Sequence, residues 1–185
     1  MEKGLIEALD ENGDKIGKIL SKPDIHHNGY WHKSVHIWIY NSNGEILLQK
    51  RSKNKDTHPG LYDISCAGHV DAGEEPIDTC IRELEEEIGI KANKKDLKLK
   101  EIVKKSNYIE NINWHNNQFN YEYLYKCDNL PNKFELEKDE VEEVVLMKID
   151  DLEKEIKNPS SYKKYVAHGL EYYSKVTNWI REDLT

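Results

Sequence analysis

Four glutamates lie close together near the middle of the chain, in the segment RELEEEIG at residues 82–89. If residues 76–88 form a helix, Glu83, Glu86 and Glu87 share one side of it. Like charges at these spacings repel each other by a few tenths of a kcal/mol per pair. A hard divalent cation would turn this repulsion into ligation, because carboxylate oxygens are its preferred ligands. The spacing therefore favours a site for a hard cation over a solvated helix face.

The same helix has a second, apolar side. At about 100° per residue, one narrow stripe is formed by Ile77, Ile81, Leu84 and Ile88. We expect this stripe to face the core, while Glu85 lies on neither side and is solvated. Pro76 suits a first turn and Gly89 suits a helix stop, so we predict a helix from Pro76 to Ile88.

The loop before this helix has features that a solvated charge run does not predict. Gly68 and Gly73 bracket four residues, so the backbone can fold tightly there and bring carbonyl oxygens toward the carboxylates. Arg82 could orient Glu83 or Glu74 through a bidentate pair. These accompanying residues make the metal site the better interpretation.

The pattern resembles the Nudix box. Five residues separate Gly68 from Glu74, seven more lead to Arg82, and the run Glu83-Leu84-Glu85-Glu86-Glu87-Ile88-Gly89-Ile90 completes it. The resemblance implies that Glu83, Glu86 and Glu87, with the carbonyl of Gly68, hold Mg²⁺ or Mn²⁺. In that family the metals bind a diphosphate and activate the attacking water, with Arg82 and the glutamates as the catalytic set.

The elements around this motif predict how it is positioned. A hairpin is predicted over residues 5–20, followed by a His-rich connector. Further strand candidates are 34–40, 45–51, 63–70, 97–109, 117–128 and 143–149, and helices are predicted over 150–157 and 160–183. This order predicts a mixed-sheet α/β sandwich. The resemblance specifies a Nudix-type α/β/α sandwich with a catalytic loop-helix-loop.

We expect a single domain over residues 1–185. Its parts are an N-terminal hairpin and connector (1–28), a Nudix core (29–157) and a C-terminal helix (158–185). Three widely spaced cysteines without a CxxC motif, and no leader or long apolar run, predict a cytoplasmic protein. The net charge of −8 argues against nucleic-acid binding, and no membrane contact is expected. The Tyr-rich C-terminal helix would suit a homodimer.

The resemblance extends from about Leu5 to Leu152 and is similar to the Nudix subgroup nearest to isopentenyl-diphosphate isomerase. His32 and His69 match two histidine positions of that isomerase, and His26 lies within one residue of a third. Arg51 and Lys55 match its diphosphate-binding positions. The resemblance therefore implies substrate contacts for these side chains. Whether His26, His32 and His69 form a second metal site stays open.

The isomerase alternative fails at its catalytic cysteine. That position is occupied by Ala67, and Cys66 lies one residue earlier, where a strand turns its side chain to the opposite face. A small buried core thiol is the better interpretation of Cys66. The position of an isomerase metal glutamate is occupied by Gln118. The sequence therefore favours a Mg²⁺-dependent hydrolase of a diphosphate linkage in a nucleoside diphosphate derivative or related organic diphosphate.

Several assignments stay open. A non-catalytic nucleotide-binding sensor is a third alternative, although a sensor has no reason to retain repulsive glutamates. The box offers no clear proton acceptor; the candidates are Glu122, ranked first, then Glu140, Glu143 and His69. Trp31 and Trp114 are candidates to contact the leaving group. The strand residues expected in the core are Phe119, Tyr121, Tyr123 and Tyr125.

Overall fold

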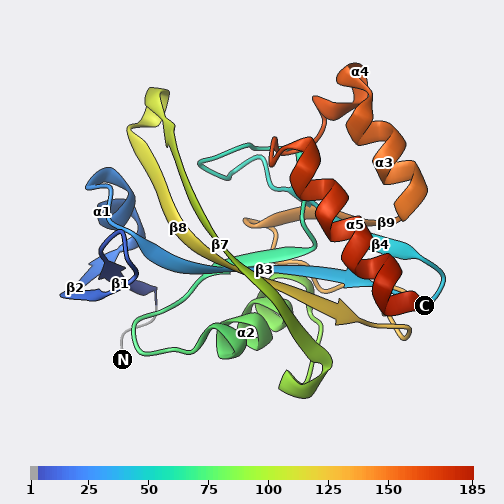
Figure 1. Cartoon of the computed structure of the whole chain (residues 1–185), viewed down its shortest axis with the longest axis horizontal. Coiled ribbons are helices and arrows are strands. Elements are labelled where there is room, and N and C mark those ends of the chain that lie inside the picture. Colours follow the sequence, from blue (N-terminus) through green and yellow to red (C-terminus); the bar gives the residue numbers. More distant parts are fainter. Residues whose placement is uncertain (1–3) are drawn as a thin grey trace.

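The computed structural model describes residues 4–185, and it shows a twisted sheet with helices on both faces (Figure 1). An N-terminal hairpin of β1 (Leu5–Leu9) and β2 (Lys15–Ser21) leads into the short helix α1 (Lys22–His27). The central strands are β3 (His32–Tyr40), β4 (Glu45–Arg51), β5 (Tyr62–Asp63), β6 (Cys66–His69), β7 (Leu97–Ile109), β8 (Trp114–Lys126) and β9 (Val141–Lys148). The longer helices are α2 (Pro76–Ile88), α3 (Ile149–Lys157) and α5 (Leu170–Leu184), and a single turn forms α4 (Pro159–Tyr162).

The sheet is mixed, as predicted. Its strands follow the order β5-β4-β3-β8-β7, with β6 paired to β3 and β9 paired to β4. β3 and β8 run parallel, and their register pairs His32 with Gln118 and His36 with Glu122. The neighbouring pair β7 and β8 is antiparallel. Because paired residues share a face of a sheet, this register decides which polar side chains of the three strands meet.

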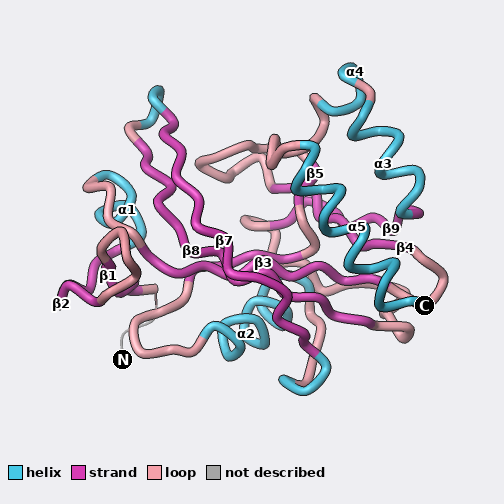
Figure 2. Tube along the Cα trace, in the orientation of Figure 1, coloured by secondary structure: helices cyan, strands magenta, loops and turns pink. Residues whose placement is uncertain are grey.

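Alternate residues of β3 belong to two separate cores, one on each face of the sheet. Val35 and Ile37 pack with residues of α2, whereas Trp38 packs with residues of α3 and α5. Figure 2 shows the strands running between these helices, with α2 on one side and α3 and α5 on the other. The arrangement confirms the predicted α/β/α sandwich.

The helix that carries the glutamates has the predicted bounds. α2 begins at Pro76 and ends before Gly89, whose φ of 72° lies in the left-handed region that glycine adopts without strain. Leu84 and Ile88 are completely buried against the sheet, and the rest of the apolar stripe packs beside them. Tyr123 and Tyr125 of β8 lie in the same core, as expected.

The continuous C-terminal helix predicted over residues 160–183 is wrong. Between α4 and α5 the chain leaves the helical path and runs beside β5, where the backbone of Tyr62 donates to Lys164 O and its carbonyl accepts from Val166 N. Pairing with an edge strand satisfies the backbone there without a helix. This detour brings His168 to the sheet.

The His-rich connector is also more regular than predicted, because six of its residues form α1. Ser21 caps this helix by accepting a hydrogen bond from the backbone of Asp24, and Pro23 lies in the first turn. As a result His26 lies on the buried side of α1 and faces the sheet. Within residues 4–185, no helix has the length and apolarity needed to cross a membrane.

Candidate metal and diphosphate site

A large cavity of about 820 Å³ lies against the sheet, and most of the predicted site residues line it. The carboxylate residues Glu83, Glu86 and Glu87 of α2 line it at one side. The other predicted site residues that line it are Gly68, His69, Arg51, Lys55 and Arg82. Residues of the β4–β5 loop, of β6 and of α2 thus meet here, although they are separated in the sequence.

Arg82 holds the carboxylate cluster together, as predicted. Its Nη1 lies 2.6 Å from Glu83 Oε1 and 3.4 Å from Glu86 Oε2. Its Nε and Nη2 donate to the two carboxylate oxygens of Glu74 at 3.2 and 2.9 Å. Nη2 also donates to the backbone oxygen of His69 at 3.1 Å. One guanidinium therefore fixes the helix, the loop and the end of β6 relative to one another.

Gly68 is required because its backbone lies against Glu83. A Cβ added at Gly68 would lie 2.1 Å from Glu83 Oε1 and 2.4 Å from Glu83 Cγ. No side chain can therefore replace the glycine unless Glu83 moves. Because of this close approach, the Gly68 backbone and the Glu83 carboxylate lie side by side at the cavity wall, as two ligands of one metal ion must.

The carboxylates need a compensating positive charge. Burial raises the pKa of Glu83 to about 7, although Arg82 opposes the shift. Burial and the nearby Glu83 raise the pKa of Glu87 to about 8. Cys66, on the core side of β6, donates its thiol to Glu87 Oε2 at 3.2 Å. Burial disfavours the charged form of these carboxylates, and a bound cation would stabilise it. Such carboxylate oxygens suit a hard divalent metal.

These pKa shifts predict that the protein without metal loses stability as pH rises. Between pH 4.5 and 8 the folded state holds more protons on Glu83 and Glu87 than the unfolded state does, so stability falls through that window. In EDTA we expect the Tm to fall by roughly 5–10 °C from pH 5.5 to pH 8. Glu87→Gln should flatten this profile, and Mg²⁺ should raise the Tm more at pH 8 than at pH 5.5. A Tm in EDTA that is constant over this range in the unmodified protein would contradict the assignment.

Three histidines form a second cluster, of which His26 and His69 line the same cavity and His32 is buried beside them. The ligand atoms of His26, His32 and His69 all lie within 4.8 Å of one another. The Nδ1 atoms of His26 and His32 face the backbone oxygens of His115 and Tyr30 at 2.9 and 3.1 Å. If these Nδ1 atoms carry the protons, both Nε2 atoms keep lone pairs that point into the cluster.

The cluster has a polar neighbour where the isomerase has a glutamate. Gln118 Nε2 lies 3.2 Å from His32 Nε2 and 3.5 Å from His69 Nε2. Burial lowers the pKa of His32 to about 4 and that of His26 to about 3, so both stay neutral at pH 7. Neutral imidazoles with facing nitrogens could hold a transition metal. The structure therefore brings together all three histidines that the sequence singled out.

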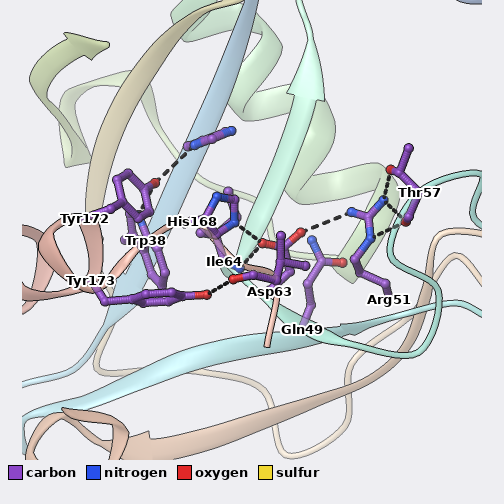
Figure 3. Close-up of polar contacts among 12 residues, drawn as sticks. Trp38, Gln49, Arg51, Thr57, Asp63, Ile64, His168, Tyr172 and Tyr173 are labelled. Atoms are coloured by element: carbon purple, nitrogen blue, oxygen red, sulfur yellow. Dashed lines mark hydrogen bonds and ion pairs between the residues drawn. The ribbon is translucent and has the colours of Figure 1, made fainter. Parts of the chain in front are cut away.

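The two predicted diphosphate-binding residues have different surroundings. Lys55 lies beside Glu140, with which it forms an ion pair. Arg51 donates from Nε and Nη2 to the backbone oxygen of Thr57 and from Nη1 to Asp63 Oδ2 at 3.1 Å. Most of the Arg51 donors thus hold the loop after β4, as Figure 3 shows.

Glu122 does not face the cleft, so that expectation is wrong. Its side chain is completely buried and does not line the cavity. Tyr172 of α5 donates to Glu122 Oε2 at 2.7 Å, and His36 Nδ1 lies 2.9 Å from Glu122 Oε1. Tyr172 satisfies one carboxylate oxygen, whereas among the described residues Oε1 is buried with only the His36 contact and forms no hydrogen bond. His36, unlike Glu122, does line the cavity.

The two tryptophans that were candidates for leaving-group contact lie in different places. Trp31 packs against Phe119 and lies under the Lys104 ammonium, away from the cavity. Trp114 lines the cavity, but its ring stacks on His26 at a centroid distance of 4.1 Å. Of the two tryptophans, Trp114 therefore lines the cavity and Trp31 does not.

Sequence reasoning missed several cavity residues. His168 Nε2 lies 2.7 Å from Asp63 Oδ1, opposite the contact between Asp63 and Arg51 (Figure 3). Lys22, in the first turn of α1, has a pKa lowered first by burial and also by Lys55. Lys22 lies only four residues before His26 in the sequence, and this proximity could have indicated that it belongs to the same site. No sequence signal joins Asp63 to His168, because they are 105 residues apart.

Comparisons with known proteins return one family. The sequence model of the NUDIX domain family matches residues 30–168. An uncharacterized Nudix hydrolase of Clostridium acetobutylicum is 35% identical over 85% of this chain and 76% of its own length. Nudix hydrolase 3 of Arabidopsis thaliana is 32% identical over 95% of this chain, which spans only 23% of that protein.

Other likenesses point to the isomerase-related subgroup and to the fold. Isopentenyl-diphosphate Delta-isomerase 2 of Photorhabdus laumondii is 34% identical over 64% of this chain and 62% of its own length. A crystal structure of a Deinococcus radiodurans protein covers 92% of this chain and 98% of that one with a TM-score of 0.66 and 20% identity. At that identity the likeness shows a shared fold.

Proposed function

Because the chain belongs to the Nudix hydrolase family, we propose that it hydrolyses a diphosphate linkage in a nucleoside diphosphate derivative or a related organic diphosphate, and that it needs Mg²⁺ or Mn²⁺. The observation that carries this proposal is that Glu83, Glu86 and Glu87 of α2 line one cavity wall, where Arg82 contacts Glu83 and Glu86 and the Gly68 backbone lies against Glu83. Lys22 and Lys55 line the same cavity and supply positive charge for phosphate oxygens.

A divalent cation bound by Glu83, Glu86 and Glu87 would neutralise phosphate oxygens and lower the pKa of a bound water. The chain itself contributes orientation. Arg82 fixes the Glu83 carboxylate, and the Gly68 backbone leaves room for it. Cys66 donates to Glu87 and so limits the positions of that buried carboxylate. These contacts hold the ligand oxygens before substrate arrives, which favours a fixed metal geometry.

The proton acceptor in this proposal is a group that lines the cavity. Of the acidic candidates, Glu140 does so, whereas Glu122 lies beneath the cavity behind His36. Glu122 would therefore act as a positioning residue for His36. A pH–rate profile of Glu140→Gln and Glu122→Gln separates the two. If only one variant loses the acidic limb of its pH–rate profile, the residue replaced in that variant takes part in the proton transfer.

The isomerase alternative is weakened by the place of Cys66. Its side chain lies in the core with Leu84 and Ile88, and burial raises the pKa of its thiol well above the usual value. Ala67 faces the opposite side of the sheet and lines the cavity. A methyl group there offers no proton donor or acceptor for isomerisation.

The proposal is tested with a panel of nucleotides, dinucleotides and organic diphosphates, including isopentenyl diphosphate, with Mg²⁺, Mn²⁺ or EDTA. We expect release of phosphate or a monophosphate from at least one compound, dependent on metal. Metal-independent binding of nucleotides without turnover would support the sensor alternative instead. Isotope exchange on isopentenyl diphosphate without hydrolysis would support the isomerase.

Removal of the Lys55 charge should weaken substrate binding. Lys55→Ala is expected to raise KM about tenfold with little change in kcat, because the contact is equal in the ground and transition states. Arg51→Ala should also lower the Tm, because Arg51 holds Thr57 and Asp63. Steady-state kinetics and thermal unfolding measure the two effects. Lys53→Ala is the control, because Lys53 is exposed on the same loop. An unchanged KM in Lys55→Ala would show that Lys55 does not contact the substrate.

A further inference from the structure

The floor of the cavity, away from the carboxylates, is polar across three strands. The register places His36 opposite Glu122, Ser34 opposite Asn120, and Lys105 opposite Gln118. Asn107 of β7 is likewise paired with Asn116 of β8. Since paired residues share a face, these side chains all lie on the same side of the sheet. We call Lys105, Asn107, Asn116 and Asn120 the polar patch; all four line the cavity.

The polar patch has unused hydrogen-bonding capacity. Among residues 4–185, the side chains of Lys105, Asn107 and Asn116 form no hydrogen bond or ion pair. Asn120 accepts from Ser34 Oγ at 2.5 Å through its oxygen, which leaves its amide protons for the cavity. Amide groups that both donate and accept suit hydroxyl groups, which do the same.

Lys105 adds a charge to this patch. It is half buried, and burial lowers the pKa of its ammonium group. The charges of Glu122 and Asp63 act in the opposite direction on this pKa. Those two carboxylates already have partners: Glu122 contacts Tyr172, and Asp63 contacts Arg51 and His168. An ammonium group without an ion-pair partner suits an anionic oxygen of a ligand.

The lining disfavours two other kinds of ligand. An isoprenoid chain laid over the patch would leave polar groups without water or a partner, at about 1–3 kcal/mol each. A nucleobase needs a stacking surface, but neither Phe nor Tyr lines the cavity within the described residues. Trp114 is only 6% exposed and already stacks on His26.

We propose that the polar patch binds the part of the substrate beyond its diphosphate, and that this part is a phosphorylated sugar or polyol. The inference rests on the proposed function, which places the diphosphate end of the substrate at the carboxylate cluster. The amides of Asn107, Asn116 and Asn120 contact the hydroxyl groups, and Lys105 contacts the additional phosphate. The three-histidine cluster and Gln118 lie between this patch and the Arg82 carboxylate cluster, as the bonds from Gln118 to His69 and from Arg82 to His69 show.

The test compares Lys105→Met with Lys104→Met. Lys104 precedes Lys105 in β7 and lies on the opposite face, over Trp31. Its variant therefore removes one positive charge at a place away from the cavity. Kinetics are measured with 5-phosphoribosyl 1-diphosphate, ATP and geranyl diphosphate. We expect Lys105→Met to raise KM for the sugar diphosphate at least tenfold and to leave the other two within twofold. Lys105→Arg should restore most of the binding.

Binding of ribose 5-phosphate, followed by calorimetry in EDTA, tests the patch without turnover. The unmodified protein should bind it, and Lys105→Met or Asn116→Ala should weaken the binding at least fivefold. No binding by the unmodified protein, or equal weakening by Lys104→Met, would overturn the inference. Absence of hydrolysis for every diphosphate, with this binding intact, would instead count against the proposed function.

Discussion

Replacement of Glu86 or Glu87 by Gln lowers turnover by about a hundredfold or more in our expectation, while the fold persists. Gln keeps the shape of the side chain but removes a charged metal ligand, so the loss falls on the catalysed step. Glu87 is 5% exposed and lies near the buried Glu83, so Glu87→Gln should also relieve repulsion and raise the Tm in EDTA at pH 8. Turnover, Mg²⁺ affinity and thermal unfolding are measured on the same preparations.

Glu85→Gln is the matched control for both variants. Glu85 lies on the same helix, is exposed, and pairs with Lys91 at 3.6 Å away from the cavity. An exposed pair of this kind contributes less than about 1 kcal/mol. The control should therefore keep normal turnover and metal affinity. Near-normal activity in both Glu86→Gln and Glu87→Gln would remove these residues from the metal site.

The second large effect is expected from one methyl group. Gly68→Ala should lower turnover by about a hundredfold, because its Cβ would overlap the Glu83 side chain down to Cγ. Rotation of the carboxylate end alone does not relieve this overlap, so Glu83 must leave its place and its bond with Arg82. We expect weaker Mg²⁺ binding and a Tm change of only a few degrees, since the backbone of Gly68 has no special conformation.

A double-mutant cycle with Glu83→Ala, followed by thermal unfolding and Mg²⁺ binding, distinguishes this mechanism from general damage to β6. Truncation at Cβ removes the atoms that the methyl group would overlap, so Gly68→Ala should cost much less in the Glu83→Ala background than in the unmodified protein. Additive losses in the two variants would show that Gly68→Ala acts through something other than Glu83.

Local signals in the sequence were sufficient for the helix that carries the carboxylates. The apolar period, Pro76 and Gly89 together determine its bounds, because each acts within a few residues along the chain. The same holds for the β3–β4 turn and for the place of Cys66 on the core side. The contacts of Arg82 were predictable because its partners, Glu83 and Glu74, lie one and eight residues away.

Long-range pairing explains what the sequence could not show. Glu122 reads as a polar residue on a strand that faces solvent or a cleft, yet Tyr172 and His36 bury it completely. Nothing near Glu122 in the sequence indicates these partners. The predicted continuous C-terminal helix failed for a related reason: helical propensity lost to pairing of residues 164–166 with β5.

The contacts of the C-terminal segment also bear on how the chain folds. Asp63 and Glu122 are both buried, and their partners His168 and Tyr172 come from the segment that docks last along the chain. Without that segment Asp63 would keep only Arg51 as an ion-pair partner, and Glu122 only the His36 contact, among the described residues. Each carboxylate would therefore retain water on its open side, since burial of an incompletely paired charge is unfavourable. Docking of α5 and dehydration of this face of the sheet are therefore one cooperative event. During synthesis, the cavity floor can close only after residue 172 has left the ribosome, so an earlier part of the chain would hold the Nudix helix but not a finished binding site.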